Sequence, residues 1–391
     1  MSTKPTRKNK NGLLAIIYSA GFLFAFHLAL LTYIESSFLA TFIQERFVGT
    51  IYTIAAVITI TILSNISKIL DKLGNYVTFN TLLILEIGLL LSLVFVHNPI
   101  LTIISFILHL SIITVMVFNL DIFLESNSSN ESTGGTRGIY LTFYNAAWVI
   151  PPLIAGLVLT NGDYWKIFIL ASAFVLPVIL ILHSKFDDFI DPKYDKVPFW
   201  GTLKEIWHKR DIFRIFMSNF MLNFFFSWMV IYTPLYLHNH IGLDWGQIGI
   251  IFTVMLLPFV ILEIPLGKLA DLRWGEKELL VIGFVIMAVS TASLSFINSP
   301  SVWLWALILF LTRTGASIVL AMNETYFFKQ INASNANIIG FFRNARPLAY
   351  IVSPIIATAL LSFLEFRFLF LVLGFLMLWS LRYIYELKDT K

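Results

Sequence analysis

Two short polar stretches, far apart in the chain, share one pattern. Residues 67–75 read SKILDKLGN, and residues 267–277 read GKLADLRWGEK. In each, an aspartate is followed within two positions by a basic residue and then by a glycine, and Asp271 stands 200 positions after Asp71. Each stretch separates two apolar runs of about 20 residues, the length that crosses a bilayer core as a helix. The pattern therefore indicates a membrane protein with two related halves.

Twelve apolar runs follow one another along the chain. They cover residues 13–34, 48–69, 76–96, 100–123, 138–160, 165–183, 213–237, 246–270, 278–297, 301–323, 337–362 and 367–386. Because an apolar stretch also follows Glu35, the first helix has room to continue to Ile43. Only 13% of the 391 residues are charged, against about a quarter in soluble proteins. The predicted fold class is an all-α integral membrane protein with twelve transmembrane helices in two pseudo-symmetric six-helix bundles.

The basic residues predict the orientation of the spans. If the N-terminus lies inside, only Arg46, Lys166 and Arg367 fall in outer loops, and three arginines lie within spans. The other 21 of the 27 lysines and arginines are then on the inner side, as the positive-inside rule requires. We expect a multi-pass protein of the plasma (inner) membrane with both termini cytoplasmic.

The longest polar stretch divides the spans six and six. We therefore predict an N-terminal bundle over residues 1–183, a cytoplasmic connector over 184–212 and a C-terminal bundle over 213–391. Landmarks recur in the same order in both halves, since Gly138 and Pro152 match Gly340 and Pro354 at a spacing of 202. Parallel repeats of this kind build the two rocking halves of many transporters.

The duplicated polar stretches resemble the loop signature of the major facilitator superfamily. The resemblance extends over the whole chain through the span count and the six-plus-six division, although the first copy has Ser67 where the family has glycine. It implies a secondary transporter that works by alternating access, with gating roles for Asp71, Lys72, Gly74, Gly267, Asp271 and Arg273. A polar loop that only sets the topology is the alternative interpretation.

Ionisable side chains inside the spans include His27, Glu86, His109, Glu263 and Arg313, and Glu35 stands just beyond the first span. Such residues are costly in a bilayer, so each is a functional hypothesis. For each histidine, an interhelical hydrogen bond is the simpler explanation. Glu35 is equally well placed to anchor its helix at the membrane interface, and Glu86 fits a structural hydrogen bond as well as a functional role.

Arg313 is expected to need a partner, because arginine does not give up its charge. It stands 12 residues beyond Ser301, which places it about 18 Å deep in its helix. Glu263 is the predicted partner and Glu35 the alternative. If substrate, or a proton on Glu263, breaks the pair of Arg313 and Glu263, binding would be coupled to the rocking movement of the two halves.

Polar and aromatic residues gather on two further spans. Asn219 and Asn223 share one helix face, and Tyr144, Asn145 and Trp148 lie close together on another span. By the family resemblance these helices line the central cavity, where such side chains suit an amphipathic substrate, and interhelical packing explains them nearly as well. The acidic run from Asp187 to Asp191 reads as a solvated part of the connector.

The predicted function is therefore secondary active transport of a small molecule, with protons as a candidate coupling ion and export of amphipathic compounds slightly favoured. A membrane-embedded enzyme of lipid or prenyl metabolism is the alternative, and a channel is disfavoured by the duplication. We expect no catalytic residues, cofactor, metal or nucleic-acid partner, and a monomer in the lipid bilayer. The absence of cysteine excludes disulfides and thiolate chemistry.

Overall fold

The computed structural model describes residues 7–127, 133–159, 162–194, 208–262, 265, 275–330 and 342–388. Within these ranges ten helices are long and apolar enough to cross a membrane, and two shorter apolar helices, Trp245–Ile261 and Ala345–Leu360, occupy the two remaining predicted spans. The prediction of an all-helical membrane protein is confirmed.

The chain forms two compact units. The first contains Met1–Glu35 and Val57–Asp195, and the second contains Ser36–Ala56 and Lys196–Lys391. The segment Ser36–Ala56 was expected in the N-terminal bundle, but its contacts are with the second unit. The division at residues 183 and 213 stays a prediction.

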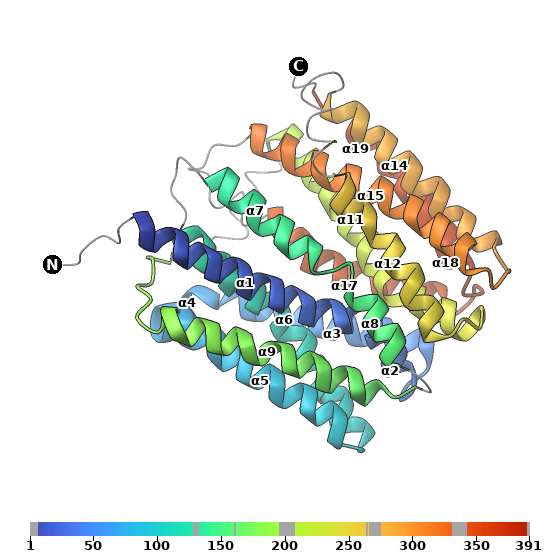
Figure 1. Cartoon of the computed structure of the whole chain (residues 1–391). Coiled ribbons are helices and arrows are strands. Elements are labelled where there is room, and N and C mark those ends of the chain that lie inside the picture. Colours follow the sequence, from blue (N-terminus) through green and yellow to red (C-terminus); the bar gives the residue numbers. More distant parts are fainter. Residues whose placement is uncertain are drawn as a thin grey trace. The chain divides into compact units, whose positions relative to one another are not determined.

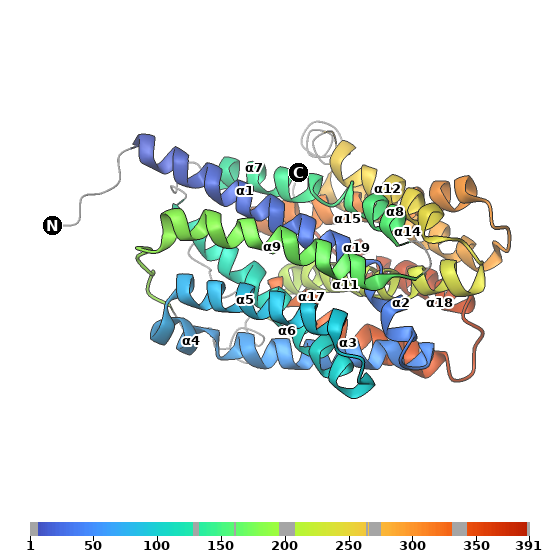
Figure 2. The same ribbon diagram turned by 60° about the horizontal axis from the view of Figure 1, so that its bottom comes forward.

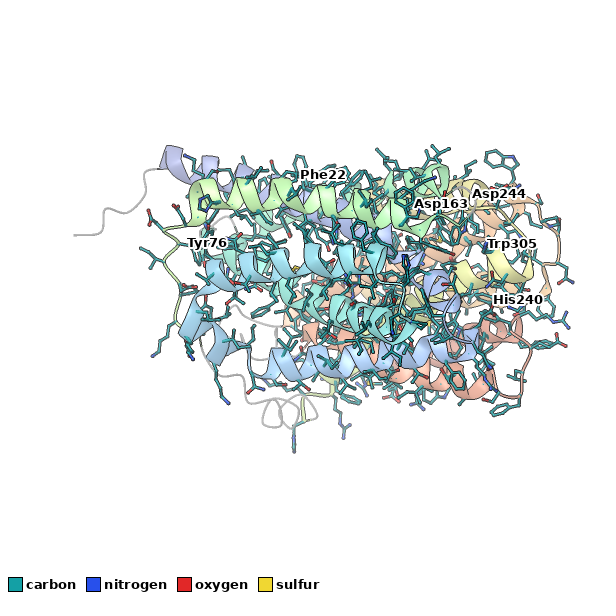
Figure 3. All side chains as sticks on the ribbon, turned by 90° about the horizontal axis from the view of Figure 1, so that it is seen from below. Phe22, Tyr76, Asp163, His240, Asp244 and Trp305 are labelled. Carbon is teal, nitrogen blue, oxygen red and sulfur yellow. The ribbon has the colours of Figure 1, made fainter. Side chains whose placement is uncertain are left out.

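The helices of the first unit run side by side along its length (Figure 1). They are α1 (Arg7–Thr32), the later part of α3 (Glu45–Ser64), α4 (Ile66–Leu73), α5 (Asn75–Phe95), α6 (Pro99–Asn127), α7 (Thr133–Ala146), α8 (Pro151–Val158) and α9 (Tyr164–Phe186). Figure 3 shows Tyr76 and Asp163, near the starts of α5 and α9, at opposite ends of this unit with Phe22 between them. This is the arrangement of an up-and-down bundle.

The second unit begins with the short helix α2 (Glu35–Ala40), apart from Glu35 itself, and the first half of α3. It continues with α11 (Arg210–Leu235), a π-helical turn (Tyr236–His240), α12 (Trp245–Ile261), α14 (Glu276–Ser293), a 3-10 turn (Leu294–Phe296), α15 (Val302–Gln330), α17 (Ala345–Leu360), α18 (Phe368–Trp379) and α19 (Leu381–Tyr385). Figure 2 shows α12, α14 and α15 as neighbours, as their packing requires. His240, Asp244 and Trp305 lie together at one end of the unit (Figure 3).

Several predicted spans are interrupted helices. The second span ends at Ser64, and after Asn65 the chain continues as α4, so the stretch from Ser67 to Leu73 is helical rather than a loop. The fifth span breaks between Ala146 and Pro151, because consecutive prolines cannot donate the backbone hydrogen bonds of a continuing helix. The first span ends at Thr32 and resumes as α2 at Glu35.

Glycine allows the closest helix contact of the second unit. A Cβ on Gly315 of α15 would lie 2.6 Å from the carbonyl oxygen of Gly283 on α14, and a Cβ on Gly283 would lie 3.0 Å from the carbonyl oxygen of Gly315. Small residues let helix backbones approach in a bilayer, where no hydrophobic force drives helices together. The pair fixes α14 against α15.

Candidate functional site

Four ionisable side chains meet inside the first unit, although they come from four different helices. The Nε2 atom of His27 on α1 lies 3.1 Å from Oε1 of Glu86 on α5. On α6, the Nδ1 atom of His109 lies 2.7 Å from Oε1 and 3.0 Å from Oε2 of the same carboxyl. The Nε2 atom of His109 lies 3.0 Å from Oε1 of Glu35 at the start of α2. We call His27, Glu86, His109 and Glu35 the His-Glu network.

The network is almost completely shielded from solvent. The side chains of His27, Glu86 and His109 are fully buried, and that of Glu35 is 5% exposed. Unpaired charges at such depth are very costly, so burial of this kind requires that each polar atom find a partner. Hydrogen bonds between the four side chains, and one from His27 to the backbone of α9, supply such partners, and Glu35 is the end closest to solvent.

One proton of the network is fixed by geometry. The Nδ1 atom of His27 lies 3.0 Å from the backbone carbonyl oxygen of Ala171 on α9. A carbonyl oxygen only accepts, so Nδ1 of His27 must carry a hydrogen and donate it. The Nε2 atom of His27 is then free either to accept from a protonated Glu86 or to donate to an ionised one.

A count of protons gives the charge of the network. The contacts form four hydrogen bonds in series, from the Ala171 carbonyl through His27, Glu86 and His109 to Glu35. With one proton in each bond, the charges of two carboxylates and two imidazolium rings sum to zero. The net charge is also zero if both acids and both rings are neutral. The full network is therefore neutral however its protons are distributed. Loss of one proton leaves a buried negative charge and one unfilled hydrogen bond.

The positions of these residues in their helices explain why they meet. Glu86 stands 11 residues after the start of α5 at Asn75, and His109 stands 10 residues after the start of α6 at Pro99. These offsets correspond to about 16 and 15 Å, close to the middle of a bilayer core of about 30 Å. Since α5 and α6 pack as successive antiparallel helices, the two side chains lie at the same depth.

The four side chains are linked in series by hydrogen bonds and do not surround a common centre. No group of three or more histidine, aspartate or glutamate side chains in the described parts of the protein has the geometry to hold a metal ion. Hydrogen-bonded acids and imidazoles in series are instead suited to binding and passing protons.

The first polar stretch is organised by the connector. Gly74 adopts a φ of +80° between α4 and α5, which glycine tolerates and other residues rarely adopt. The Oδ1 atom of Asp191 accepts a hydrogen bond of 2.7 Å from the backbone N–H of Asn75, at the first turn of α5. Asp191 thus occupies the helix N-terminus, where a carboxylate is favourable. Asp191 is exposed, as expected for a solvated part of the connector, and it also caps α5.

Tyr194 extends this contact. Its hydroxyl donates to Oδ1 of Asp191. Burial, together with that hydrogen bond and the nearby charges of Asp191 and Asp71, raises the pKa of Tyr194 above its usual range. The phenol therefore remains a donor, and Asp71 and Lys72 stand in the last turns of α4 beside this junction. A gating role of Asp71, Lys72 and Gly74 stays a prediction.

Part of the predicted site lies outside the described residues. This holds for the second polar stretch, with Gly267, Asp271 and Arg273, and for Glu263. Arg313 is described, and its guanidinium lies 5.4 and 5.3 Å from the ring centres of Phe225 and Phe226 on α11. The aromatic faces stabilise this buried cation, which is 2% exposed. Its predicted pairing with Glu263 stays a prediction.

The amide residues of α11 have packing partners within their unit. The side chain of Asn219 donates to the carbonyl oxygen of Phe342, and Asn223 donates to the carbonyl and side-chain oxygens of Asn219. These contacts favour the packing interpretation for Asn219, while Asn223 is only half-buried. A role in substrate binding stays a prediction for both.

The aromatic residues of the fifth span form a ladder. The ring of Tyr144 lies 5.9 Å from that of Tyr140 and 6.4 Å from that of Trp148. Tyr144, Asn145 and Trp148 are half-buried, and Trp148 stands in the break between α7 and α8. Their partial exposure is compatible with the predicted contact to substrate.

Comparison with known proteins defines the class. Residues 216–389 match the model of the Major Facilitator Superfamily. No curated protein matches the sequence. The structure is similar to the crystal structure of a mutant of the nucleoside transporter NupG, with a TM-score of 0.77 and 10% identity over 96% of this chain and 99% of that chain.

Apolar helices at all twelve predicted spans, the family match and the shared fold define a multi-pass membrane transporter rather than an enzyme. The match over residues 216–389 and the shared fold support a secondary membrane transporter of the Major Facilitator type. The resemblance inferred from the two polar stretches is confirmed.

Proposed function

We propose that this protein is a proton-coupled secondary active transporter of a small molecule. It works by alternating access, as a monomer, in the plasma (inner) membrane, with both termini in the cytoplasm. Protons supply the driving force and bind within the first unit.

The observation that carries this proposal is the His-Glu network. Two acids and two imidazoles at the depth of the bilayer centre are not needed to hold a helical bundle together, because apolar side chains of the same volume stabilise a core at least as well. Buried chains of acids and histidines mark proton pathways in transporters. The network is neutral when it holds four protons and carries one negative charge when it holds three. It therefore offers a site for one coupling proton.

The proposed substrate is an amphipathic small molecule, and the proposed direction is export. Half-buried Tyr144, Asn145 and Trp148 offer aromatic faces and an amide group, which suit a ligand with apolar and polar parts. NupG is described as a nucleoside transporter, and nucleosides combine a flat ring with hydroxyls. They belong in the first panel of candidate substrates beside amphipathic cations and sugars.

Transport in proteoliposomes tests the proposal. Purified protein is first screened for compounds that raise its thermal stability. The best compound is then supplied with and without an imposed pH gradient, for the unaltered protein and for Glu86→Gln. We expect the gradient to drive accumulation by the unaltered protein. Glu86→Gln should retain exchange of labelled for unlabelled compound and lose gradient-driven accumulation.

A control separates coupling from damage. Gly88→Ala changes a residue two positions along α5 where a Cβ would meet no atom within 4 Å, and it should transport like the unaltered protein. Gradient-driven accumulation that persists in Glu86→Gln would rule out the network as the proton site.

A further inference from the structure

The His-Glu network reaches the break between the first two helices. α1 ends at Thr32, and α2 begins at Glu35. Glu35 is also the last residue of the first compact unit before the chain continues as Ser36–Ala56 in the second unit. The hydrogen bond from His109 on α6 to Glu35 therefore holds the chain at the point where it passes from the first unit into the second.

The segment Ser36–Ala56 is fixed within the second unit by contacts along its length. Glu45 accepts hydrogen bonds from Asn239 at 2.6 Å and from His240 at 2.9 Å, both in the π-helical turn. Gly49 packs so closely on α11 that a Cβ there would lie 2.1 Å from the hydroxyl oxygen of Tyr232. Thr53 donates to the carbonyl oxygen of Ile351 on α17. The segment thus behaves as part of the second unit, although α3 continues into the first.

The start of this segment contains unsatisfied polar groups. Ser36 and Ser37 are buried, and neither hydroxyl has a hydrogen-bond partner in the structure. Buried hydroxyls without partners destabilise the conformation that buries them. Exposing the first turn of α2 would let these hydroxyls find partners, and the bond from His109 to Glu35 opposes that exposure.

We infer that the proton occupancy of the His-Glu network controls whether Glu35, the first residue of α2, is held by His109. This inference rests on the proposed function, because it assigns to the same proton site the conformational step that a coupled transporter requires. With all four protons present, the bond between His109 and Glu35 is made and α2 is anchored. After one proton is lost, that bond opens and the first turn of α2 is released.

The direction follows from exposure and from proton linkage. Among the four side chains only that of Glu35 has any exposure, so a carboxylate there gains hydration on leaving, while Glu86 has no access to water. When the network lacks a proton, the Nε2 atom of His109 is left facing an ionised carboxylate with no hydrogen between them. Since the anchored state holds one proton more than the released state, raising the pH favours release.

The described parts of α1, α5, α6 and α9 carry further ionisable groups. On α1 the remaining ones are Arg7, Lys8, Lys10 and Tyr18, on α5 Tyr76, on α6 Asp121 and Glu125, and on α9 Tyr164, Lys166, His183 and Lys185. Apart from Tyr18, they stand within the terminal two turns of their helices. Tyr33, which is buried next to the end of α1, is the nearest phenol in sequence.

Thiol labelling tests the inference without substrate or gradient. The protein has no cysteine, so each single substitution supplies one thiol. Ser37→Cys places it in the first turn of α2, where Ser37 is 3% exposed, and Thr41→Cys places it just after α2 at an exposed position. The maleimide labelling rate is measured for both in purified protein from about pH 5 to about pH 9. Dividing the Ser37→Cys rate by the Thr41→Cys rate corrects for the ordinary pH dependence of thiolate formation, and the same ratio in Glu35→Gln corrects for the higher pKa of a buried thiol.

We expect this ratio to rise at least several-fold as the pH is raised. Glu35→Gln keeps a side chain that hydrogen-bonds His109 but cannot ionise, so the ratio should stay low at every pH. Glu35→Ala removes the bond, so the ratio should be high at every pH. A ratio that does not change with pH while Glu35 is intact overturns the inference, and so does a rise that persists in Glu35→Gln. Labelling requires no transport. A negative labelling result therefore rejects the inference about Glu35, whereas only the accumulation assay rejects proton-coupled transport.

Discussion

At the scale of single residues, Glu86 is the centre of the buried network, because its carboxyl contacts both histidines. Glu86→Leu would leave two imidazoles fully buried without their partner. Removing one member of a buried ionic group costs about 3–5 kcal/mol. Glu86→Gln retains hydrogen bonds to the rings and should cost clearly less. Unfolding of purified protein in detergent, followed by intrinsic fluorescence, measures both variants. Equal stability of Glu86→Leu and the unaltered protein would show that the network is hydrated or unformed.

Gly74 gives a second test at this scale. Its φ of +80° and ψ of 159° lie in a region that is essentially restricted to glycine, and a Cβ there would lie 2.7 Å from Oδ2 of Asp191. Gly74→Ala should therefore destabilise the first unit by about 1–3 kcal/mol and expose the connector to protease. Gly88→Ala, in the helix α5 that follows Gly74, is the matched control and should be neutral or slightly stabilising. Identical cleavage rates for the two variants would contradict the described turn.

At the scale of secondary-structure elements, the second unit depends on the contact between α14 and α15. Gly315→Ala would place a methyl group 2.6 Å from the Gly283 carbonyl and 2.7 Å from the backbone nitrogen of Met287. Backbone atoms cannot turn away as a flexible side chain can, so the helices must separate at a cost of about 1–3 kcal/mol. Hydrogen exchange of peptides from 276–330 should accelerate in Gly315→Ala. Unchanged protection would mean that the two helices are further apart than described.

The interrupted helices show where sequence reasoning was least complete at this scale. Apolar runs located the spans, because hydropathy responds to the bilayer. They did not locate the breaks after Ser64 and Thr32, since neither contains a proline and both depend on tertiary contacts such as the bond of Glu35 to His109. The break before Pro151 had a local signal in the paired prolines.

At the scale of the whole molecule, the distribution of lysine and arginine predicts the orientation. Reporter fusions after Pro99 and after Gly162 should score as extracellular, and fusions within residues 184–211 should score as cytoplasmic. Alkaline phosphatase and fluorescent-protein reporters give opposite signals at each site and control for expression. A cytoplasmic score after Gly162 would reverse the proposed orientation.

The fold was largely predictable from the sequence, and the site was not. Span number, the two-fold repeat and the family resemblance depend on local patterns such as the stretches at Asp71 and Asp271. The sequence marks His27, Glu35, Glu86 and His109 each as costly in a bilayer, but it does not show that they meet. The equal depths of Glu86 and His109 could have been counted from their helix starts. Which faces the four helices turn toward one another depends on packing, which no local pattern records.

The central claim is that the His-Glu network binds the coupling proton, and proton release on substrate binding tests it most directly. A compound from the stability screen is added to purified protein in weakly buffered detergent solution, and the pH change is followed with an indicator dye. Repeating the measurement in two buffers of different ionisation enthalpy by calorimetry gives the number of protons. We predict about one proton per bound molecule in the unaltered protein and none in Glu86→Gln, provided that the variant still binds. The same proton movement in both proteins would contradict the account.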